Sequence, residues 1–504
     1  MIETFINKYL IFRYRKIDKF LHKPFQTQEN VLSYLLKNGT DTYFGQEHHF
    51  GNIRHADDFR KYVPVSRYEN LRPYLDKIIL EKGKNILWNS PVKWFAMSSG
   101  TTEDKSKYIP VTEESLRQCH YECGEQMLSI YAKHHPKSKF LLGKTLIIGG
   151  SKQINNIGEG IFTGDISAIL IKNLYYWAKQ KRTPEDIALL TDWEEKLEAL
   201  TKFAMKSDIR ALMGVPSWML ILLKKIREES GKSLNELWPD FEVFFHGGVN
   251  FAPYQGQYNE LIGNPDIEYW ETYNASEGFF GVQYDSTSKD MLLMLNSGIY
   301  YEFMPMDQWD KEHPETLTLE EVKPHENYAM IISTNGGLWR YMLGDTIEFT
   351  SVDPFLFRVT GRTKSFINAF GEELIIDNAE KAIEQACRET GATISDYTAA
   401  PVYFQENKGG AHEWLIEFEK QPSDIDNFTV KLDQALQSVN SDYEAKRAHN
   451  ISLQMPIIRT LPKGTFVSWM ESQNKLGGQN KVPKLANHRN YIEKILTYIE
   501  RNHK

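Results

Sequence analysis

The stretch SSGTTEDKSKYIP, residues 98–110, gathers hydroxyl and glycine residues and follows them with two lysines. It comes after VKWFAM (92–97), which predicts a strand, and before 111–135, whose apolar spacing predicts a helix with Thr112 as its N-cap. Backbone N–H groups in such a turn form a concave site for an anion. The Walker pattern of phosphate-binding loops is absent. The residues alone therefore leave two interpretations open: a phosphate loop of another kind, or an ordinary polar loop.

Length and composition limit the class of protein. The chain has 504 residues, 41% of them hydrophobic, which predicts one large domain and a smaller one. A net charge of −8 argues against a general nucleic-acid binder, because such proteins need clustered lysine and arginine. Three cysteines, Cys119, Cys123 and Cys387, fit a reducing compartment. We expect a cytoplasmic protein that is a monomer and has no nucleic-acid partner.

The N-terminal segment MIETFINKYLIFRYRKIDKF (1–20) is interrupted by charges throughout. It therefore predicts neither a signal peptide nor a membrane-spanning helix. Its pattern indicates an amphipathic helix with aromatic residues on one side. Such a helix could bind a membrane surface or dock on the protein's own core. We expect the second, and no membrane partner.

Helices and buried strands alternate along most of the chain, which predicts an α/β core. Residues 183–231 are predicted to be a long helical region broken around GVPSW (214–218). After about residue 362 the pattern changes to a smaller α+β unit. The runs predicted to be strands or β-rich are 144–151, 241–248, 266–278, 291–305 and 328–337.

Two further motifs carry groups that could bind a nucleotide. In YNASEG (273–278) an aromatic side chain, Tyr273, could stack on a base, and Glu277 could hold a magnesium ion that bridges phosphates. In GGLWRYMLGDTIEF (336–349), Asp345 could accept hydrogen bonds from ribose hydroxyls. Each has a plainer interpretation, as a cross-strand tyrosine, a solvated glutamate or a turn aspartate.

Two basic motifs follow, GRTK (361–364) with Arg362 and LGGQNKVPKL (476–485) with Lys481. In this order the motifs resemble the adenylate-forming superfamily of CoA synthetases, adenylation domains and luciferases. Within it, Lys107 three residues before Pro110, the Ser-Glu form of YNASEG and the Arg-Tyr…Gly-Asp element resemble the auxin-responsive Gretchen Hagen family of acyl-acid amido synthetases, including its bacterial relatives. The resemblance covers roughly residues 90–485.

The resemblance implies a fold and a set of site residues. The fold would be a large N-terminal domain (1–362) of β-sheets flanked by helices, which binds ATP and the acyl acid, and a small mobile α+β domain (363–504). Glu277 would bind Mg²⁺, and Lys481 would meet the α-phosphate. The other residues implied to contact ATP are Ser98, Ser99, Gly100, Thr101, Thr102 and Lys107 at the phosphates, Gly247, Gly248 and Tyr273 at the adenine, and Asp345 and Arg362 at the ribose.

The implied activity has two steps. A small carboxylic acid is adenylated by ATP with Mg²⁺, and an amino-acid amine then takes the acyl group and AMP leaves. A CoA ligase with the same first step and a non-catalytic adenylate-binding protein stay open as alternatives. The sequence identifies neither the acid nor the amino acid. Two departures from the family pattern are Glu103-Asp104 in the loop and Lys484, where relatives often carry arginine.

Overall fold

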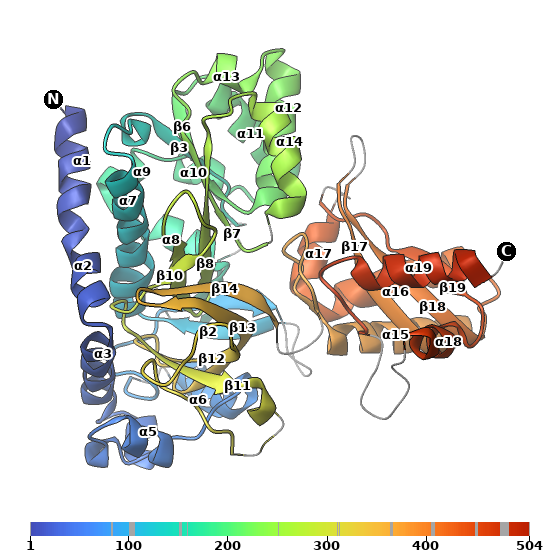
Figure 1. The fold of residues 1–504 in the computed structure, drawn as a ribbon, viewed down its shortest axis with the longest axis horizontal. Helices are drawn as coiled ribbons and strands as arrows, with labels where there is room; N and C mark the ends of the chain where they lie inside the picture. Colours follow the sequence, from blue (N-terminus) through green and yellow to red (C-terminus); the bar gives the residue numbers. More distant parts are fainter. Residues whose placement is uncertain are drawn as a thin grey trace. The chain divides into compact units, whose positions relative to one another are not determined.

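The structure is a computed structural model, shown in Figure 1. It describes residues 2–81, 84–99, 106–150, 154–158, 160–249, 251–309, 311, 313–362, 366–404, 409–448, 452–473 and 483–502. The backbone alone is described at residues 2–6, 81, 99, 106, 158, 177, 217, 252, 253, 362, 377 and 502. The chain divides into two compact units, one of residues 1–97 and 108–363 and the other of residues 98–107 and 364–504.

A ten-stranded mixed sheet forms the centre of the N-terminal unit. Strands β3, β6, β7 and β8 pair in parallel, and the remaining neighbours pair antiparallel. The order is β11 (Ile299–Pro305), β12 (Asn327–Thr334), β13 (Tyr341–Val352), β14 (Phe355–Arg362), β10 (Met291–Leu293), β9 (Gly278–Gln283), β8 (Glu268–Ala275), β7 (Val243–Gly247), β6 (Ile209–Gly214) and β3 (Lys144–Ile147).

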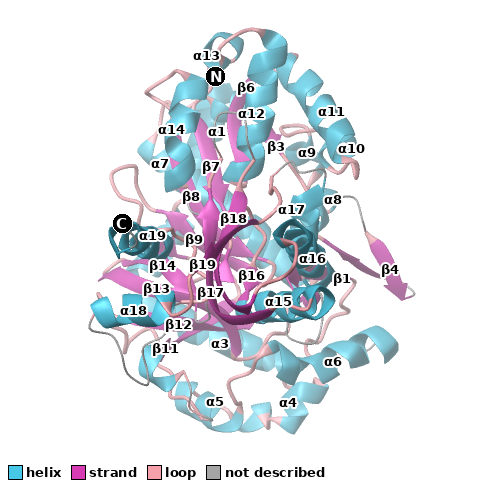
Figure 2. Cartoon of the chain, turned by 90° about the vertical axis from the view of Figure 1, so that its right-hand side faces the viewer, coloured by secondary structure: helices cyan, strands magenta, loops and turns pink. Residues whose placement is uncertain are grey.

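Helices connect and cover the parallel strands, as parallel pairing requires. Figure 2 shows α11, α12 and α14 flanking β6 and β7. The helices between β5 and β8 are α8 (Ile166–Lys172), α9 (Tyr176–Lys179), α10 (Glu185–Ala188), α11 (Trp193–Met205), α12 (Pro216–Ser230), α13 (Leu234–Leu237) and α14 (Ala252–Ile262).

The sequence-based prediction for residues 183–231 is wrong in one part. DIRALMG is not helical: Ile209–Gly214 is strand β6, in the parallel half of the sheet. Its residues Ile209, Ala211 and Leu212 are fully buried. Periodicity cannot distinguish such a short apolar run from a buried helix segment, and pairing with β3 and β7 decides it.

The stretch from 92 to 135 begins with a strand and ends in a helix, as predicted, but a second strand that was not predicted lies just before the helix. Strand β1 (Trp94–Ser99) and β2 (Ser106–Val111) lie in a second sheet of order β2-β1-β5-β4, with β5 (Ile161–Gly164) and β4 (Asn155–Gly158). Thr112 caps the following helix, since its Oγ1 accepts a hydrogen bond of 3.0 Å from the Ser115 N–H. The first turns (Ser115–Tyr121) are π-helical before α7 (Glu122–His134) begins.

The N-terminal segment docks on the protein, as expected. Its helices are α1 (Ile2–Arg13), α2 (Arg15–His22) and α3 (Pro24–Gly39). Tyr14, Ile17 and Phe20 enter the main hydrophobic core. The elements between α3 and β1 are α4 (Tyr43–Glu47), a 3-10 turn (Phe50–Asn52), α5 (Ala56–Tyr62) and α6 (Tyr68–Glu81), and two further 3-10 turns lie at Phe140–Leu142 and Met306–Gln308.

The C-terminal unit has its own core around a three-stranded sheet of order β17-β18-β19. Its strands are β17 (Thr393–Val402), β18 (Ala411–Lys420) and β19 (Ile457–Leu461), with a short pair β15 (Phe366–Ile367) and β16 (Leu374–Ile375). Its helices are α15 (Ile376–Thr390), α16 (Ile425–Val439), α17 (Ser441–Arg447), α18 (Thr465–Ser472) and α19 (Asn490–Asn502). Buried His412 contacts Glu372 at 2.7 Å in this unit.

The predicted fold class is confirmed: α/β, with helix-flanked sheets in a large N-terminal part and a smaller α+β C-terminal part. Among the helices of the described residues, none combines the length and apolar composition that a bilayer span requires.

Candidate active site

Two of the predicted nucleotide-binding residues meet directly. Tyr273, near the end of β8, donates a hydrogen bond of 2.5 Å from its hydroxyl to Oδ2 of Asp345 in β13. The two residues are 72 positions apart in the sequence, and three strands separate β8 from β13 in the sheet. Asp345 is 8% exposed, so its carboxylate lies mostly out of solvent. The fold therefore joins the second and third motifs into one site.

The ring of Tyr273 is held by aromatic neighbours. Its centroid lies 5.0 Å from that of Phe280 and 6.1 Å from that of Phe357. Such tilted and edge-to-face contacts stabilise an aromatic pair by about 0.5–1.5 kcal/mol beyond area burial. Tyr273 itself is half-buried, which leaves part of the side chain accessible to a ligand.

Local backbone geometry places Asp345. The backbone of Gly344 has a φ of +95°, which residues other than glycine rarely adopt. The register of β13 against β12 shifts between Met342 and Thr346, on either side of Gly344. Across the ladder, the Cα partner of Asp345 is Arg362 at the end of β14, so the fourth motif lies beside the third.

The Gly247–Gly248 turn lies against the strand of Tyr273. Gly247 pairs with Thr272 in the parallel ladder of β7 and β8. A Cβ atom on Gly247 would stand 2.4 Å from the Thr272 carbonyl oxygen, so only glycine permits this approach. Gly248 follows with φ of +83°. The fold thus brings Gly247 and Gly248 next to Tyr273.

Glu277 lies in the tight turn between β8 and β9 and is half-buried. Among the described residues, no group of three or more His, Cys, Asp or Glu side chains is arranged to hold a metal ion. Mg²⁺ commonly keeps several waters and binds through one or two carboxylates plus substrate phosphates. A single turn carboxylate is compatible with that kind of site.

The remaining predicted residues are placed only in part. Ser98 and Ser99 are the last residues of β1, and Lys107 is the second residue of β2. Gly100, Thr101, Thr102 and the Glu103–Lys105 segment lie outside the described residues, as does Lys481. Lys484, one of the departures from the family pattern, forms an ion pair with Asp396 and lies 4.6 Å from the ring centroid of Tyr397.

The sequence did not predict the contacts of Arg340, the arginine of the Arg-Tyr…Gly-Asp element. Arg340 is 3% exposed, and its Nε and Nη2 donate hydrogen bonds of 2.9 Å to the two carboxylate oxygens of Glu302 in β11. It also donates to the Val63 carbonyl at 2.6 Å and to Thr316 at 2.7 Å. Arg340 is thus a structural anchor for the strand that carries Asp345. No pattern in the sequence around Arg340 identifies Glu302 as its partner.

Burial also dominates the electrostatics beside the Gly247–Gly248 turn. Removal from water, with a smaller effect of Lys289, lowers the pKa of His246 to about 3. Burial likewise raises the pKa of the Glu271 carboxyl, on the neighbouring strand. The imidazole of His246 stacks on Phe251 at 4.2 Å between centroids. His246 is 3% exposed, so its surroundings are weakly hydrated, and electrostatic interactions are stronger in such surroundings.

Comparisons with known proteins identify the family of the chain. Three family models match successive parts of the chain: the GH3 family N-terminal domain at residues 13–267, the central domain at 292–362 and the C-terminal domain at 377–490. The first alone covers half of the chain.

Relatives match over nearly their full length. The 4-substituted benzoates-glutamate ligase GH3.12 of Arabidopsis thaliana is 22% identical, over 91% of this chain and 92% of the relative. A GH3.15 acyl acid amido synthetase has a TM-score of 0.60 at 19% identity, covering 94% of this chain and 93% of its own. A 2-hydroxyisobutyryl-CoA ligase has a TM-score of 0.56 at 12% identity, covering 97% and 93%. The structures share the fold. The resemblance inferred from the motifs is confirmed, and this chain belongs to the GH3 family.

Proposed function

We propose that this chain is an ATP-dependent acyl-acid amido synthetase, which adenylates a small carboxylic acid and passes the acyl group to an amino acid. The observation that carries the proposal is the contact of Tyr273 with Asp345 beside the Gly247–Gly248 turn, in a chain of the GH3 family. Relatives are named as ligases that join an acid to an amino acid, such as a benzoate to glutamate. We extend that reaction class to this chain.

The nucleoside would lie at the Tyr273–Asp345 pair. The half-buried ring of Tyr273 offers a face for the adenine, with Gly247 and Gly248 leaving room on the neighbouring strand. Asp345 would accept a hydrogen bond from a ribose hydroxyl, since a carboxylate has about four lone-pair sites and can accept from several donors at once. Arg362, the ladder partner of Asp345, would lie close to the ribose and phosphates.

The phosphates would be bound by residues of the first motif, and the metal ion by Glu277. We assign Ser98, Ser99, Gly100, Thr101 and Thr102 to the β- and γ-phosphates, with Lys107 nearby. We assign Glu277 to Mg²⁺, which would neutralise phosphate charge and lower the barrier to displacement when bound.

In the first step, a carboxylate oxygen of the acid attacks the α-phosphorus, and the bond to pyrophosphate breaks. Lys481 would stabilise the charge on the phosphoryl oxygens. In the second step, the amine attacks the acyl carbon, loses a proton and displaces AMP. Because the protein supplies mainly positioning and charge, residues 1–362 would hold the substrates and residues 363–504 would act as a mobile lid that brings Lys481 to them.

We further propose that the protein works as a monomer in the cytoplasm. The three cysteines are free, and Cys119 and Cys123 are buried, which suits a reducing compartment. The acid and the amino acid are to be identified by experiment. A second candidate, a CoA ligase, deserves a direct comparison because a 2-hydroxyisobutyryl-CoA ligase shares the fold over 97% of this chain.

Hydroxamate trapping tests the first step. The protein is incubated with ATP, Mg²⁺, hydroxylamine and a panel of carboxylic acids, and acid-dependent hydroxamate and pyrophosphate are measured. We expect both products with at least one acid of the panel and neither without ATP. Nucleotide binding without acid-dependent pyrophosphate release would favour a non-catalytic adenylate binder instead.

A further inference from the structure

The N-terminal helices have two different faces. Asn7, Leu10, Tyr14, Ile17 and Phe20 are buried against the protein. The opposite side carries a set of exposed residues that we call the basic face: Lys8, Tyr9, Phe12, Arg15, Lys16, Lys19, His22 and Lys23. At 100° per residue these positions fall within less than half of the helix circumference. Docking on the protein's own core therefore accounts for one face of the segment and leaves the other in solvent.

The net charge of this segment is positive, whereas that of the whole chain is negative. Residues 7–25 contain six lysines and arginines and one acid, Asp18, whereas the whole chain has a net charge of −8. Asp18 is half-buried at the margin of the basic face. Helix α7 packs behind the segment and contributes Glu122 and Glu125. The segment is thus a positive region on an acidic protein.

The two glutamates of α7 neutralise only part of the positive charge of this segment. Glu125 pairs with Arg13 at 2.6 Å, and Glu122 pairs with Arg13 at 2.9 Å and with Lys16 at 3.0 Å. Within the described part of the chain, four cations of the basic face make no ion pair: Lys8, Arg15, Lys19 and Lys23.

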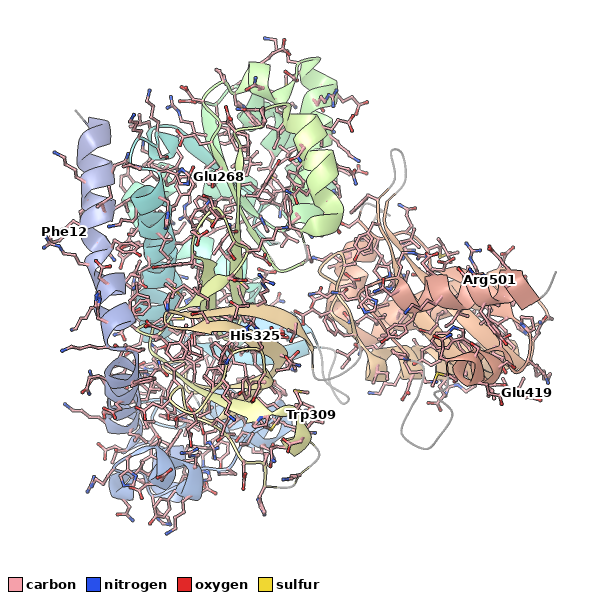
Figure 3. All side chains as sticks on the ribbon, in the orientation of Figure 1. Phe12, Glu268, Trp309, His325, Glu419 and Arg501 are labelled. Carbon is pink, nitrogen blue, oxygen red and sulfur yellow. The ribbon has the colours of Figure 1, made fainter. Side chains whose placement is uncertain are left out.

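Two aromatic side chains lie among these cations. Phe12 is 59% exposed and Tyr9 is 51% exposed. Figure 3 shows Phe12 pointing away from the protein. The Arg15 guanidinium lies 4.7 Å from the centroid of the Phe12 ring. Aromatic side chains are enriched at membrane–water interfaces, and clusters of lysine and arginine are attracted to anionic lipid surfaces.

From these observations we propose, in contrast to the expectation of no membrane partner, that the basic face binds the surface of an anionic phospholipid bilayer. Lys8, Arg15, Lys19 and Lys23 would contact lipid phosphates, and the rings of Tyr9 and Phe12 would enter the headgroup region. Residues 8–23 span roughly 24 Å at about 1.5 Å per residue, so the helices can lie flat on the surface. Figure 1 shows α1 and α2 in line along one side of the N-terminal unit. This proposal does not depend on the proposed reaction.

Two other partners fit the observations less well. A second copy of the chain presenting the same face would place cations against cations, which is repulsive. A duplex nucleic acid would satisfy the cations, but its bases are stacked inside the helix and leave no apolar surface for the exposed ring of Phe12. The net charge of −8 also opposes a polyanion that extends beyond the patch. A bilayer supplies both the phosphates and the apolar boundary.

Sedimentation of the full chain with lipid vesicles tests the proposal. Each lysine near an anionic surface contributes a factor of about five to binding. We expect binding to phosphatidylcholine vesicles that contain about 30% phosphatidylglycerol, and loss of binding without phosphatidylglycerol or at high salt. The triple variant K8Q/K19Q/K23Q should bind at least about tenfold more weakly. Phe12→Ser should weaken binding while keeping its salt dependence.

Matched controls separate the basic face from general charge. K206Q/K232Q/K323Q removes three exposed lysines elsewhere in the N-terminal unit, and Leu80→Ser removes an exposed apolar side chain. Both should bind as the unchanged protein does. Unchanged thermal unfolding of every variant shows that folding is intact. The proposal fails if no vesicle binds, if the control and test variants bind equally, or if a duplex RNA competes the protein off the vesicles.

Discussion

The hydroxyl of Tyr273 donates a hydrogen bond to the carboxylate of Asp345, and this bond links strands β8 and β13 across the central sheet. A nucleoside at this pair predicts a defined pattern of variants. Asp345→Ala should weaken ATP binding about 10- to 100-fold, because a hydrogen bond to a charged group is worth about 1.5–3 kcal/mol. Tyr273→Phe keeps the ring and should weaken binding only severalfold. Calorimetric titration with ATP measures both.

The double variant sharpens this test. Tyr273 and Asp345 share a hydrogen bond, so their effects on ATP binding should not add. Strictly additive effects, or an Asp345→Ala protein that binds ATP normally, would remove the pair from the nucleotide site.

Lys481→Ala tests the chemistry of the first step. The proposed role of this lysine is to stabilise charge in the transition state, so the variant should slow acid-dependent ATP–pyrophosphate exchange by at least about 100-fold with ATP affinity nearly unchanged. Lys494→Ala is the matched control, an exposed lysine on α19. Equal exchange rates for the two variants would show that Lys481 is not catalytic.

The buried pair of Arg340 and Glu302 predicts a large loss of stability. Glu302→Gln leaves the guanidinium of Arg340 without its counter-ion in a site that is 3% exposed. Breaking such a pair is expected to reduce the free energy of unfolding by about 3–5 kcal/mol. Arg358→Gln is the control, because it breaks an ion pair with Asp290 in which the arginine side chain is 60% exposed. This variant should change the free energy of unfolding by less than about 1 kcal/mol. Denaturant unfolding compares them; similar losses would contradict the anchoring role.

Buried His120 predicts a dependence of stability on pH. Burial lowers the pKa of His120 to about 4, below the value of about 6.5 for an unfolded chain. The unfolded state therefore binds a proton first as the pH falls. The stability contributed by this group is present above pH 6.5 and is lost progressively towards pH 4, by about 3 kcal/mol in all.

The variant His120→Leu should flatten that dependence. Thermal unfolding between pH 7 and pH 4.5 should show a smaller fall in Tm for His120→Leu than for the unchanged protein. His55→Gln, in which a side chain 67% exposed is replaced, should retain the full fall. An identical slope for all three proteins would show that His120 does not contribute.

Local patterns predicted much of this molecule. The strand before residue 98 and the helix capped by Thr112 were predicted correctly, because the cap bonds a backbone N–H only three residues away. The Tyr273 and Asp345 motifs were identified as nucleotide candidates from their residue types. Their direct contact was not predicted, because it depends on the order of strands in the sheet.

The misses share a physical cause. Strand β6 was assigned to a helical region because it is defined by pairing with β3 and β7, which lie far from it in the sequence. The ion pair of Arg340 with Glu302 joins residues 38 positions apart, and the hydrophobic periodicity of the sequence does not indicate it. The π-helical turns at Ser115–Tyr121 were not predicted either, because apolar spacing indicates a helix but not which type of helix. Tertiary contacts decide such features.

The most direct test of the central claim is the identity of the acyl acceptor. An acid that supports hydroxamate formation is incubated with the protein, ATP and Mg²⁺, with either a mixture of amino acids or CoA, and AMP and the acyl product are measured by mass spectrometry. We predict AMP release driven by an amino acid, with a product whose mass is that of acid plus amino acid minus water. AMP release driven only by CoA, with a thioester product, would contradict the account.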